Sequence, residues 1–563
     1  MSKIEALRGT IMEAGRNNST PVRWDFVSTF SNKHEAAVGE SLGPEALAGH
    51  LIGENGEGVK VDHFDLQLDP LKKIVPNVSM HKPDIIGISI KIGALEQTDE
   101  IIRAINNLPW EDGGRPLLVL GGVVSTFATV DLLRRYPQAV LVTGEGEIAT
   151  QMLVEAVRGD RVFEEIPGIA FINGEGKIIT THHRLWPLEK LHLPARITTK
   201  RIHDEMKGMV WAEDSRGCDF ACTFCSRRAL RGSGFSGDMS PKRVVDDLER
   251  LAKMGIHRVN FTGDDFGGNP ERTYRIADEI IQRGIRMEWS VATRADHIFE
   301  RKNTPEQNAR LQEIMKHCVK AGLTGVFMGL ESGSQSQLKR YGKQITVDEN
   351  YKAIEALRKL NIDVVVGYIP IDYLMTVTEL RETLEFLEKT KMGLKVTNPL
   401  SVLRVQSGSP YLKLMKREGL LGEQTEDLVF YEARFKDPRI ELIAQLANKW
   451  VEDLYPIIYG LKWAGAAITL TKEAQNSPAR NIESTLHTFR KLELSFLKSL
   501  VEELEKSGSI DQDAIDGIKK VFVGKRRILL GKAKSQLFAG SYGDIQTSRH
   551  LVAIKNFLVN RTY

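Results

Sequence analysis

The sequence predicts an α/β protein in which two parallel sheets are followed by a helical domain. Strand-like apolar runs alternate with amphipathic segments over residues 24–160, which is typical of a doubly wound parallel sheet. The alternation resumes near residue 206 and gives six strand–helix units without a reversal, which indicates a partial (β/α)6 barrel. From about residue 440 onward the periodicity is helical, so the chain is expected to end in a helical domain.

The composition fits a multidomain globular protein. The chain has 563 residues, of which 42% are hydrophobic and 27% charged, and this length predicts about three or four domains. No apolar run approaches the ~20 residues that cross a bilayer. The first residues lack an apolar signal segment, so a cytoplasmic location is expected. The predicted division is an N-terminal extension (1–23), a first α/β domain (24–160), a linker (161–205), a partial barrel (206–425) and a C-terminal helical domain (426–563).

The first α/β domain is predicted from β-branched runs that alternate with amphipathic ones. Its strands are expected at residues 24–29, 59–64, 84–90, 116–124 and 139–143, and its helices at 44–53, 98–107, 130–135 and 148–157. Doubly wound sheets bind ligands beyond the carboxyl ends of their strands. The candidate binding residues at those ends are Ser89, Gly121, Gly122, Gly144, Glu145, Gly146 and Glu147.

The partial barrel is predicted in the same way. Its strands are expected at residues 208–213, 258–262, 287–292, 325–330, 363–370 and 395–402, and its helices at 241–254, 270–283, 304–321 and 348–360. Barrel enzymes carry their active sites at the carboxyl ends of the strands. Residues that follow these strands are therefore the candidates for catalysis.

Three of the four cysteines form one motif directly after the first expected barrel strand. Cys218, Cys222 and Cys225 have the spacing C-x-x-x-C-x-x-C, whereas Cys318 stands alone in a helical stretch and is expected to be a buried core residue. Three nearby thiolates can hold an iron–sulfur cluster and leave one iron open to another ligand. A zinc site would need a fourth protein ligand, and no second cysteine pair lies nearby. A zinc site and a purely structural cluster remain the alternatives.

The cysteine motif, with Phe224 just before its third cysteine, resembles that of the radical S-adenosylmethionine (SAM) superfamily. The resemblance implies that the three cysteines ligate a [4Fe–4S] cluster and that SAM binds beside it on a TIM-type partial barrel. Further segments resemble the superfamily at the strand ends: TGDD (262–265), WSVATRAD (289–296), GLESG (329–333) and VGYIP (366–370). The SAM-binding residues that the resemblance implies are Phe224, Thr262, Gly263, Asp264, Ser290, Arg294, Gly329, Glu331, Ser332 and Tyr368. No catalytic acid or base is singled out.

The first domain resembles the Rossmann-like (flavodoxin-like) cobalamin-binding domain that precedes the barrel in one radical SAM subfamily. The matching stretches are LG to HL (42–51), PDIIGIS (83–89), LGG (120–122) and VTGEGE (142–147). The resemblance implies that these loops hold the corrin rim and the nucleotide tail. The Asp-x-His-x-x-Gly loop of some cobalamin proteins is absent from the sequence, so a histidine below the cobalt is not expected. A cofactor-free spacer domain is the alternative.

This combination of domains implies a cobalamin-dependent radical SAM enzyme. The chemistry that this resemblance most commonly implies is methyl transfer to an unactivated carbon or phosphorus centre of a small molecule or peptide. The transfer would proceed by way of a 5′-deoxyadenosyl radical and methylcobalamin. A radical rearrangement or cyclisation, and transfer of the aminocarboxypropyl group of SAM, are the alternatives. The implied partners are the substrate and an external electron donor of the flavodoxin or ferredoxin type. Association with a membrane is not expected.

An RNA-modifying radical enzyme is the alternative from another class. Residues 517–563 carry ten Lys and Arg against one Asp, a balance that could suit nucleic acid but is more typical of a solvated helical face. RNA methylthiotransferases carry three further N-terminal cysteines, and no cysteine precedes Cys218 in this sequence. A nucleic-acid partner is therefore not expected.

Overall fold

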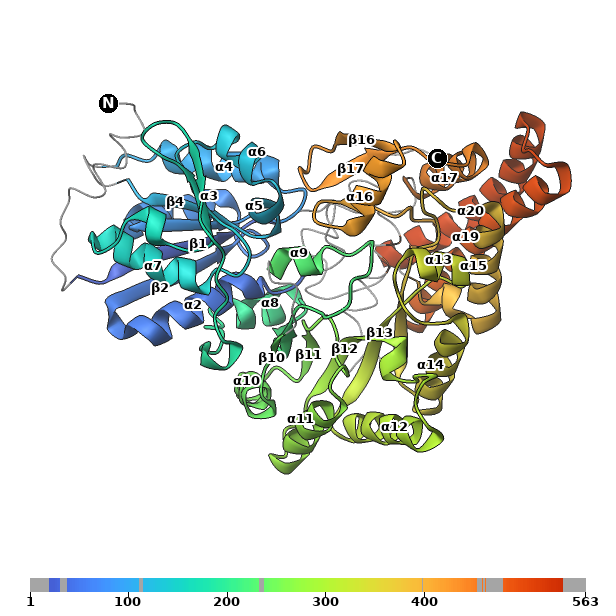
Figure 1. Ribbon diagram of the computed structural model, residues 1–563, viewed down its shortest axis with the longest axis horizontal. Helices are drawn as coiled ribbons and strands as arrows, with labels where there is room; N and C mark the ends of the chain where they lie inside the picture. Colours follow the sequence, from blue (N-terminus) through green and yellow to red (C-terminus); the bar gives the residue numbers. More distant parts are fainter. Residues whose placement is uncertain are drawn as a thin grey trace.

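The computed structural model shows three successive parts in the predicted order (Figure 1). In this view the N-terminal sheet and its helices lie on the left, and the C-terminal helices lie on the right. The structure describes residues 20–30, 38–110, 115–231, 237–396, 398–452, 458, 461 and 479–539. The predicted N-terminal extension up to residue 19 and the basic tail beyond residue 539 lie outside these residues. Within them, no helix has the length and apolar character needed to cross a membrane.

The first domain is built on a seven-stranded sheet with the order β2-β1-β3-β4-β5-β6-β7. The strands are β1 (Val22–Ser28), β2 (Val59–Asp65), β3 (Ile85–Ser89), β4 (Leu117–Gly121), β5 (Val140–Val142), β6 (Ile169–Ile172) and β7 (Ile178–Thr180). Neighbours among β1 to β5 pair in parallel, whereas β6 and β7 add antiparallel strands at the β5 edge. The strand order reverses between β1 and β3, where doubly wound sheets bind their ligands. The predicted doubly wound domain is confirmed.

Helices cover both faces of this sheet. They are α2 (Leu42–Asn55), α3 (Leu71–His81), α4 (Leu95–Asn106), α5 (Val123–Phe127), α6 (Thr129–Arg135) and α7 (Glu147–Arg158). The predicted helices correspond to α2, α4, α6 and α7, whereas α3 and α5 are not predicted. Helix α3 buries only Ile74 and Val78 and carries Pro76 in its interior. Its apolar periodicity is too sparse, and its proline too unfavourable, for sequence-based recognition.

Side chains alternate across β1 and so belong to two different cores. Trp24 and Phe26, whose ring centroids lie 5.2 Å apart, join the core under α2 and α7. Val27 joins the core under α3 and α4 on the opposite face. Because successive side chains of a strand point to opposite faces, Asp25 shares the face of Val27.

The second part is built on a five-stranded parallel sheet with the order β14-β13-β12-β11-β8. The strands are β8 (Trp211–Ala212), β11 (Arg258–Phe261), β12 (Glu288–Arg294), β13 (Leu323–Glu331) and β14 (Asp363–Tyr368). The sixth expected strand, at residues 395–402, is reduced to two isolated parallel bridges, from Val366 to Val396 and from Ile371 to Val402. Pro399 lies in that segment and lacks the N–H that a strand ladder needs.

The remaining elements of the second part surround this sheet. The helices are α8 (Thr199–Met206), α9 (Arg227–Arg231), α10 (Pro241–Lys253), α11 (Pro270–Gln282), α12 (Pro305–Lys320), α13 (Gln335–Arg340), α14 (Val347–Lys359), α15 (Val377–Thr390) and α16 (Pro410–Arg417). The short strands are β9 (Ser215–Arg216), β10 (Gly237–Asp238), β15 (Val405–Gln406), β16 (Leu421–Gln424) and β17 (Phe430–Ala433). Ser240, Asn269, Thr304 and Thr346 cap α10, α11, α12 and α14, which accounts for their sharp beginnings.

The C-terminal part is helical, as predicted. Its described helices are α17 (Pro438–Glu452), α19 (Ala479–Ser507) and α20 (Gln512–Ala539). Trp450 is buried and stacks on Phe496, with 4.5 Å between the ring centroids. This core also includes Leu380 and Leu384 of α15, so the helices pack directly on the second part.

The linker between the two sheets is fixed by a buried charge cluster. Arg196 Nη1 donates to Glu40 Oε2 at 2.7 Å, and the same guanidinium pairs with Asp247 of α10. The Arg196 side chain is 1% exposed, and those of Glu40 and Asp247 are 0% and 4% exposed. The Arg196 side chain therefore connects the first domain to the second through buried ion pairs.

Arg196→Met is expected to destabilise the protein by about 3–5 kcal/mol, because it leaves two buried carboxylates without a cation. Arg201→Met removes ion pairs with Asp69 and Glu205, but this arginine is 45% exposed, so we expect a loss of less than about 1 kcal/mol. Thermal denaturation followed by circular dichroism compares the two variants. Equal melting temperatures would show that the buried cluster does not stabilise the junction.

Candidate active site between the two sheets

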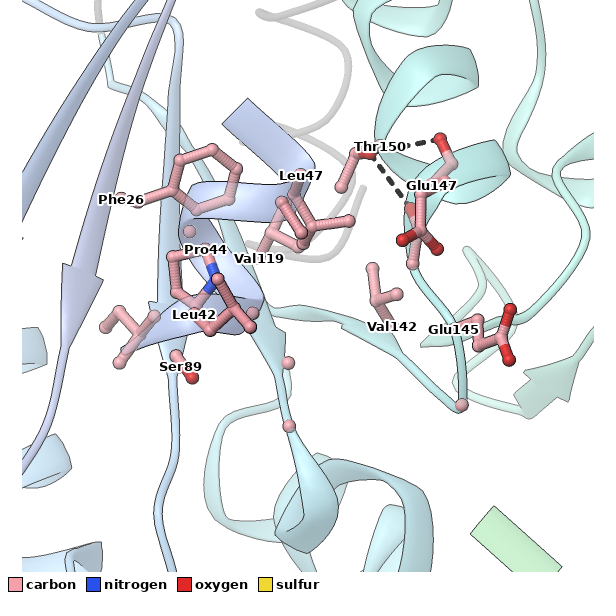
Figure 2. Close-up of a pocket in the computed structure, with 18 of the residues that line it drawn as sticks. Phe26, Leu42, Pro44, Leu47, Ser89, Val119, Val142, Glu145, Glu147 and Thr150 are labelled. Carbon is pink, nitrogen blue, oxygen red and sulfur yellow. Dashed lines mark hydrogen bonds between the residues drawn. The ribbon is translucent and has the colours of Figure 1, made fainter. Parts of the chain in front are cut away.

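A cavity of about 440 Å³ lies at the carboxyl ends of the strands of the first sheet (Figure 2). Seven of its lining residues are those that the sequence places at these ends: Ser89, Gly121, Gly122, Gly144, Glu145, Gly146 and Glu147. Figure 2 shows Glu145 on the loop before α7 and Glu147 at the beginning of α7, across the cavity from Leu42, Pro44 and Ser89. The second part supplies Glu213, Arg216, Arg227 and Thr262 to the lining. The cavity therefore belongs to both sheets.

Aromatic and glycine residues shape the wall of this cavity. A Cβ at Gly87 would come within 2.7 Å of Trp24 Nε1, so only glycine lets the indole lie against β3. A Cβ at Gly121 or Gly43 would meet no atom within 4 Å. Trp24 Nε1 is buried and has no hydrogen-bond partner among the described residues. The wall thus offers open space over Gly43 and Gly121, which suits a large ligand such as cobalamin.

The loop at residues 144–147 is held from two sides. Gly144 has a φ of +67°, and a Cβ there would approach His183 Nε2 to 2.4 Å, so both the conformation and the close contact require glycine. The Glu145 backbone N–H donates to His183 Nε2 at 3.1 Å. His183 belongs to the expected linker, and the sequence gives no signal for this role.

Arginines from the second part bind the two carboxylates of this loop. Arg216 Nη1 lies 2.8 Å from Glu147 Oε1 and 3.3 Å from Glu145 Oε2, and Arg231 Nε lies 2.8 Å from Glu145 Oε1. Burial would raise the pKa of Glu147, but the Arg216 charge outweighs it and holds that pKa below its usual value. Both predicted cobalamin-binding carboxylates are therefore ion-paired across the domain junction.

A second cavity of about 330 Å³ continues from the first toward the cysteine loop. It shares Gly122, Glu145 and Thr262 with the first cavity and adds Gly217 and Asp264. Gly217 directly precedes Cys218 in the chain. The space over the first sheet therefore leads to the beginning of the cysteine motif.

The cysteine loop is anchored through Thr223, between the second and third cysteines. The Thr223 backbone N–H donates to the Tyr341 carbonyl at 2.8 Å, and the Thr223 carbonyl accepts from the Tyr411 N–H at 2.7 Å. The Phe224 ring packs edge-on against Tyr341, with 5.4 Å between centroids, and its carbonyl accepts from Gln406. This framework fixes the loop independently of any bound group.

The three motif cysteines are free and partly exposed, whereas Cys318 is fully buried in the core. Burial and the nearby Asp265 charge raise the pKa of Cys218 to about 12, and burial also raises that of Cys225. Three accessible thiols on one loop suit an iron–sulfur cluster, whose positive irons favour the thiolate form. The core location of Cys318 agrees with the sequence-based expectation.

Arg294, at the end of β12, lies against the cysteine loop. Its guanidinium lies 3.5 Å from the Phe220 ring centroid, and Nη1 lies 3.8 Å from Cys222 Sγ. Asp296 and the Lys343 carbonyl accept from the same guanidinium at 2.7 Å each. Arg294 thus places a fixed cation beside the motif, where a carboxylate of a ligand could be held.

The other predicted SAM-binding residues divide into two groups. Thr262 and Asp264 line the cavities, and Gly263 must be glycine because a Cβ would come within 2.3 Å of Asp214 and Ser215. Ser290 donates to Asn260 on the neighbouring strand. Thr262, Gly263 and Asp264 directly follow β11. Ser290, by contrast, is the third residue of β12 and lies four residues before its carboxyl end at Arg294, so its expected position at a strand end is wrong.

The second group lies on β13 and β14 or directly after β13, and its side chains bind mainly to other residues of the protein. Glu331 has a φ of +64° and accepts from Lys343 Nζ at 3.2 Å, which leaves Gly329 no room for a Cβ. Ser332 is fully buried and donates to Gln337, and the Tyr368 hydroxyl donates to the Thr383 carbonyl at 3.0 Å. Any ligand contact from Ser332 or Tyr368 would therefore come from the backbone.

Sequence reasoning missed the residues that connect the two sheets. Trp24, Glu213, Arg216 and Arg227 line the first cavity, and Arg231 binds Glu145 from α9. Arg216 could have been noticed, because it lies two residues before Cys218 in a loop that must face the active site. Glu213 pairs with Arg216 only three residues away, whereas Arg227 and Arg231 pair with the distant Asp264 and Glu145.

Two family models match the chain. A model described as a B12 binding domain matches residues 38–154, and one described as the radical SAM superfamily matches residues 213–387. The first match contains the glycine and glutamate loops of the larger cavity, and the second contains the three cysteines.

Two curated relatives are similar to much of the chain. One is 4′-phospho-dehydrooxetanocin synthase from Priestia megaterium, 24% identical over 509 residues, which cover 79% of this chain and 66% of that protein. Another is hopanoid C-3 methylase from Methylococcus capsulatus, 27% identical over 341 residues, which cover 59% of this chain and 61% of that protein. The chain thus spans less than two thirds of the length of these relatives.

Two solved structures share the fold. The cobalamin-dependent SAM radical enzyme OxsB, with aqua-cobalamin and SAM bound, has a TM-score of 0.80 at 20% identity over 97% of this chain and 85% of that chain. The radical SAM methyltransferase TsrM from Kitasatospora setae has a TM-score of 0.55 at 16% identity over 71% of this chain and 75% of that chain. The likeness to OxsB extends over the C-terminal helices as well.

Proposed function

Because the chain belongs to the cobalamin-binding subfamily of the radical SAM superfamily, we propose that it is a methyltransferase. Its substrate in this proposal is a small molecule or peptide with an unactivated carbon or phosphorus centre. An external electron donor of the flavodoxin or ferredoxin type completes the reaction.

One observation carries the proposal. The cavity over the first sheet is lined also by Thr262 at the end of β11, and its continuation reaches Gly217 beside Cys218. A group held at Gly121 and Gly144 and a group held by the cysteine loop would therefore face the same interior space. Methyl transfer from one cofactor to a radical generated at the other requires such a shared space.

The residues fit the three cofactors in different ways. Cobalamin would lie over Gly43 and Gly121, where a Cβ would meet no described atom within 4 Å, and beside the loop at Gly144. The [4Fe–4S] cluster would be held by Cys218, Cys222 and Cys225, with SAM between Arg294 and the end of β11 at Thr262. When bound, the cluster and SAM supply an organic radical, and cobalamin supplies the methyl group.

The chain itself orients these groups. Arg294 holds its guanidinium beside Cys222 through Asp296 and the Lys343 carbonyl. Arg216 fixes the loop at residues 144–147 against the cysteine loop. Both arginines belong to the second part, so the two cofactor regions are positioned by one rigid framework.

The experiment that tests the proposal uses SAM with a deuterated methyl group. The anaerobically reconstituted protein is incubated with this SAM, a reductant and candidate substrates, and the products are analysed by mass spectrometry. We expect a product that carries one intact labelled methyl group. Turnover that yields only unlabelled organic products would contradict methyl transfer.

A second candidate function is a radical transformation without methylation. It is favoured by the match to a protein named as a synthase and by the full-length likeness to OxsB, which exceeds the likeness to the methyltransferase TsrM. This likeness is one of fold, so the chemistry must be decided by the products. The labelled-methyl experiment separates the two candidates directly.

Arg216 is expected to act as a positioning residue for cobalamin. Arg216→Met leaves the buried Glu147 carboxylate unpaired, which costs roughly 3–5 kcal/mol at this loop. We expect affinity for hydroxocobalamin, measured by its absorbance change on binding, to fall at least ~10-fold, which corresponds to about 1.4 kcal/mol.

The double variant Arg216→Met/Glu147→Gln should recover part of that affinity, because it removes the unpaired charge. Arg216→Lys keeps the charge and serves as the conservative variant. If all three variants bind hydroxocobalamin as the wild type does, the ion pair does not position the loop.

A further inference from the structure

Three ligand-type side chains meet on the face of the first sheet that is covered by α3. Asp25 lies in β1, Asp62 lies directly opposite it in the parallel register of β2, and His81 ends α3. These elements belong to the first domain on the left of Figure 1. Asp25 points away from the cavity, because its neighbours Trp24 and Phe26 line that cavity from the opposite face. The cluster is therefore separate from the site described above.

The three side chains have the spacing of a metal site. One ligand atom from each lies within 4.8 Å of the others. His81 Nδ1 lies 3.2 Å from Asp25 Oδ2 and 3.5 Å from Asp62 Oδ2. The imidazole thus stands between two carboxylates that come from different strands.

Among the described residues, the Asp25 carboxylate pairs with His81 but with no lysine or arginine. Its side chain is 0% exposed, and its Oδ1 atom has no hydrogen-bond partner in the described part of the chain. Burial raises the pKa of Asp25 to about 8, and the negative charge of Asp62 adds to the shift. The Arg23 guanidinium pairs with the outer carboxylate, with Nη1 at 3.0 Å from Asp62 Oδ2. A buried carboxylate oxygen without a partner is costly unless an ion or proton joins it.

We propose that Asp25, Asp62 and His81 form a binding site for one divalent transition-metal ion. Two carboxylates and an imidazole suit Mn²⁺ or Zn²⁺, and water would complete the coordination. Asp62 is 40% exposed and His81 19% exposed, so the ion can enter from solvent. The bound ion ties β1, β2 and α3 together and takes the place of the proton on Asp25.

The test uses Mn²⁺ alone as the probe, because it prefers oxygen and imidazole over the thiolates of the cysteine loop. The full-length protein carries its cluster and cobalamin in their oxidised, diamagnetic forms. Free Mn²⁺ is measured by its electron paramagnetic resonance signal as the protein is added. We expect one ion bound per chain.

Variants of the cluster identify the site. Asp25→Asn and His81→Gln are each expected to weaken Mn²⁺ binding at least ~10-fold, while circular dichroism shows that they remain folded. Asp160→Asn is the matched control, because it removes one exposed carboxylate of the same domain outside the cluster. Arg23→Gln removes the cation that competes for Asp62, and it is expected to tighten binding.

The proposal is overturned if the wild-type protein does not bind Mn²⁺, or if Asp25→Asn binds it as tightly as Asp160→Asn does. Binding that is weakened by Arg23→Gln would also contradict it. If these residues only stabilised the fold, their substitution would not change the number of Mn²⁺ ions bound per chain. Asp25→Asn and Arg23→Gln would then not change the affinity for Mn²⁺ in opposite directions. Loss of the proposed methyl transfer would leave this result unaffected, since the two sites lie on opposite faces of the sheet.

Discussion

Replacing Cys222 with alanine is expected to abolish iron–sulfur binding and to reduce turnover to background, whereas Cys318→Ala leaves both unchanged. A cluster held by only three cysteines cannot tolerate the loss of one. Cys222 is a suitable choice because the adjacent Thr223 is fixed by Tyr341 and Tyr411, so the loop should keep its shape in the variant. Iron and sulfide content, together with the visible absorption of the reconstituted protein, measures the cluster.

Cys318 provides the matched control within the same chain. It is buried in the core of the second part, where alanine removes one sulfur atom without reaching the cysteine loop. A small loss of stability is expected, and no loss of iron. If Cys318→Ala lost its iron while Cys222→Ala retained it, the assignment of the cluster to the motif would be wrong.

Gly121→Leu is expected to prevent cobalamin binding and, with it, methyl transfer. A Cβ at Gly121 meets no protein atom within 4 Å, so the leucine side chain extends into the cavity without disturbing the strand. The cavity measures about 440 Å³, and a branched side chain at its wall would occupy the space that the corrin needs. We expect retention of hydroxocobalamin after gel filtration to disappear, while iron content stays at the wild-type level.

Gly517→Leu is the control for this substitution. Gly517 lies exposed in α20, and a Cβ there also meets no atom within 4 Å. It therefore adds the same side chain far from the cavity. If the Gly121→Leu variant retained as much cobalamin as the Gly517→Leu variant, the cofactor would not lie over β4.

The sequence was sufficient to predict the elements that bear strong local patterns. The buried β-branched runs predicted the parallel strands β1 to β5 of the first sheet, although not their order in the sheet, and the spacing of Cys218, Cys222 and Cys225 indicated the cluster loop. Helix α3 was not predicted, because it buries few residues and contains Pro76. The sixth barrel strand was predicted but is reduced to bridges beside Pro399, which shows that apolar runs alone do not guarantee a ladder.

The residues that join the two cofactor regions could not be predicted for a different reason. The pair Arg216–Glu147 depends on how two independently folded sheets meet, and neither residue has a local pattern that names its partner. The same holds for Asp25, Asp62 and His81, which are brought together only by strand register and by the end of α3. Ser332 and Tyr368 were predicted to contact SAM, but the sequence could not show that their side chains bind Gln337 and Thr383.

The measurement that tests the proposed function most directly is the ratio of the two nucleoside products of SAM during turnover. Methyl transfer through two molecules of SAM produces S-adenosylhomocysteine and 5′-deoxyadenosine in equal amounts, because one molecule loses its methyl group and the other its 5′-deoxyadenosyl group. We expect equal amounts with the wild-type protein and a methylated product in the same yield. With Gly121→Leu we expect neither S-adenosylhomocysteine nor the methylated product. Abundant 5′-deoxyadenosine without S-adenosylhomocysteine from the wild-type protein would contradict methyl transfer, and methylthioadenosine as the main product would indicate aminocarboxypropyl transfer instead.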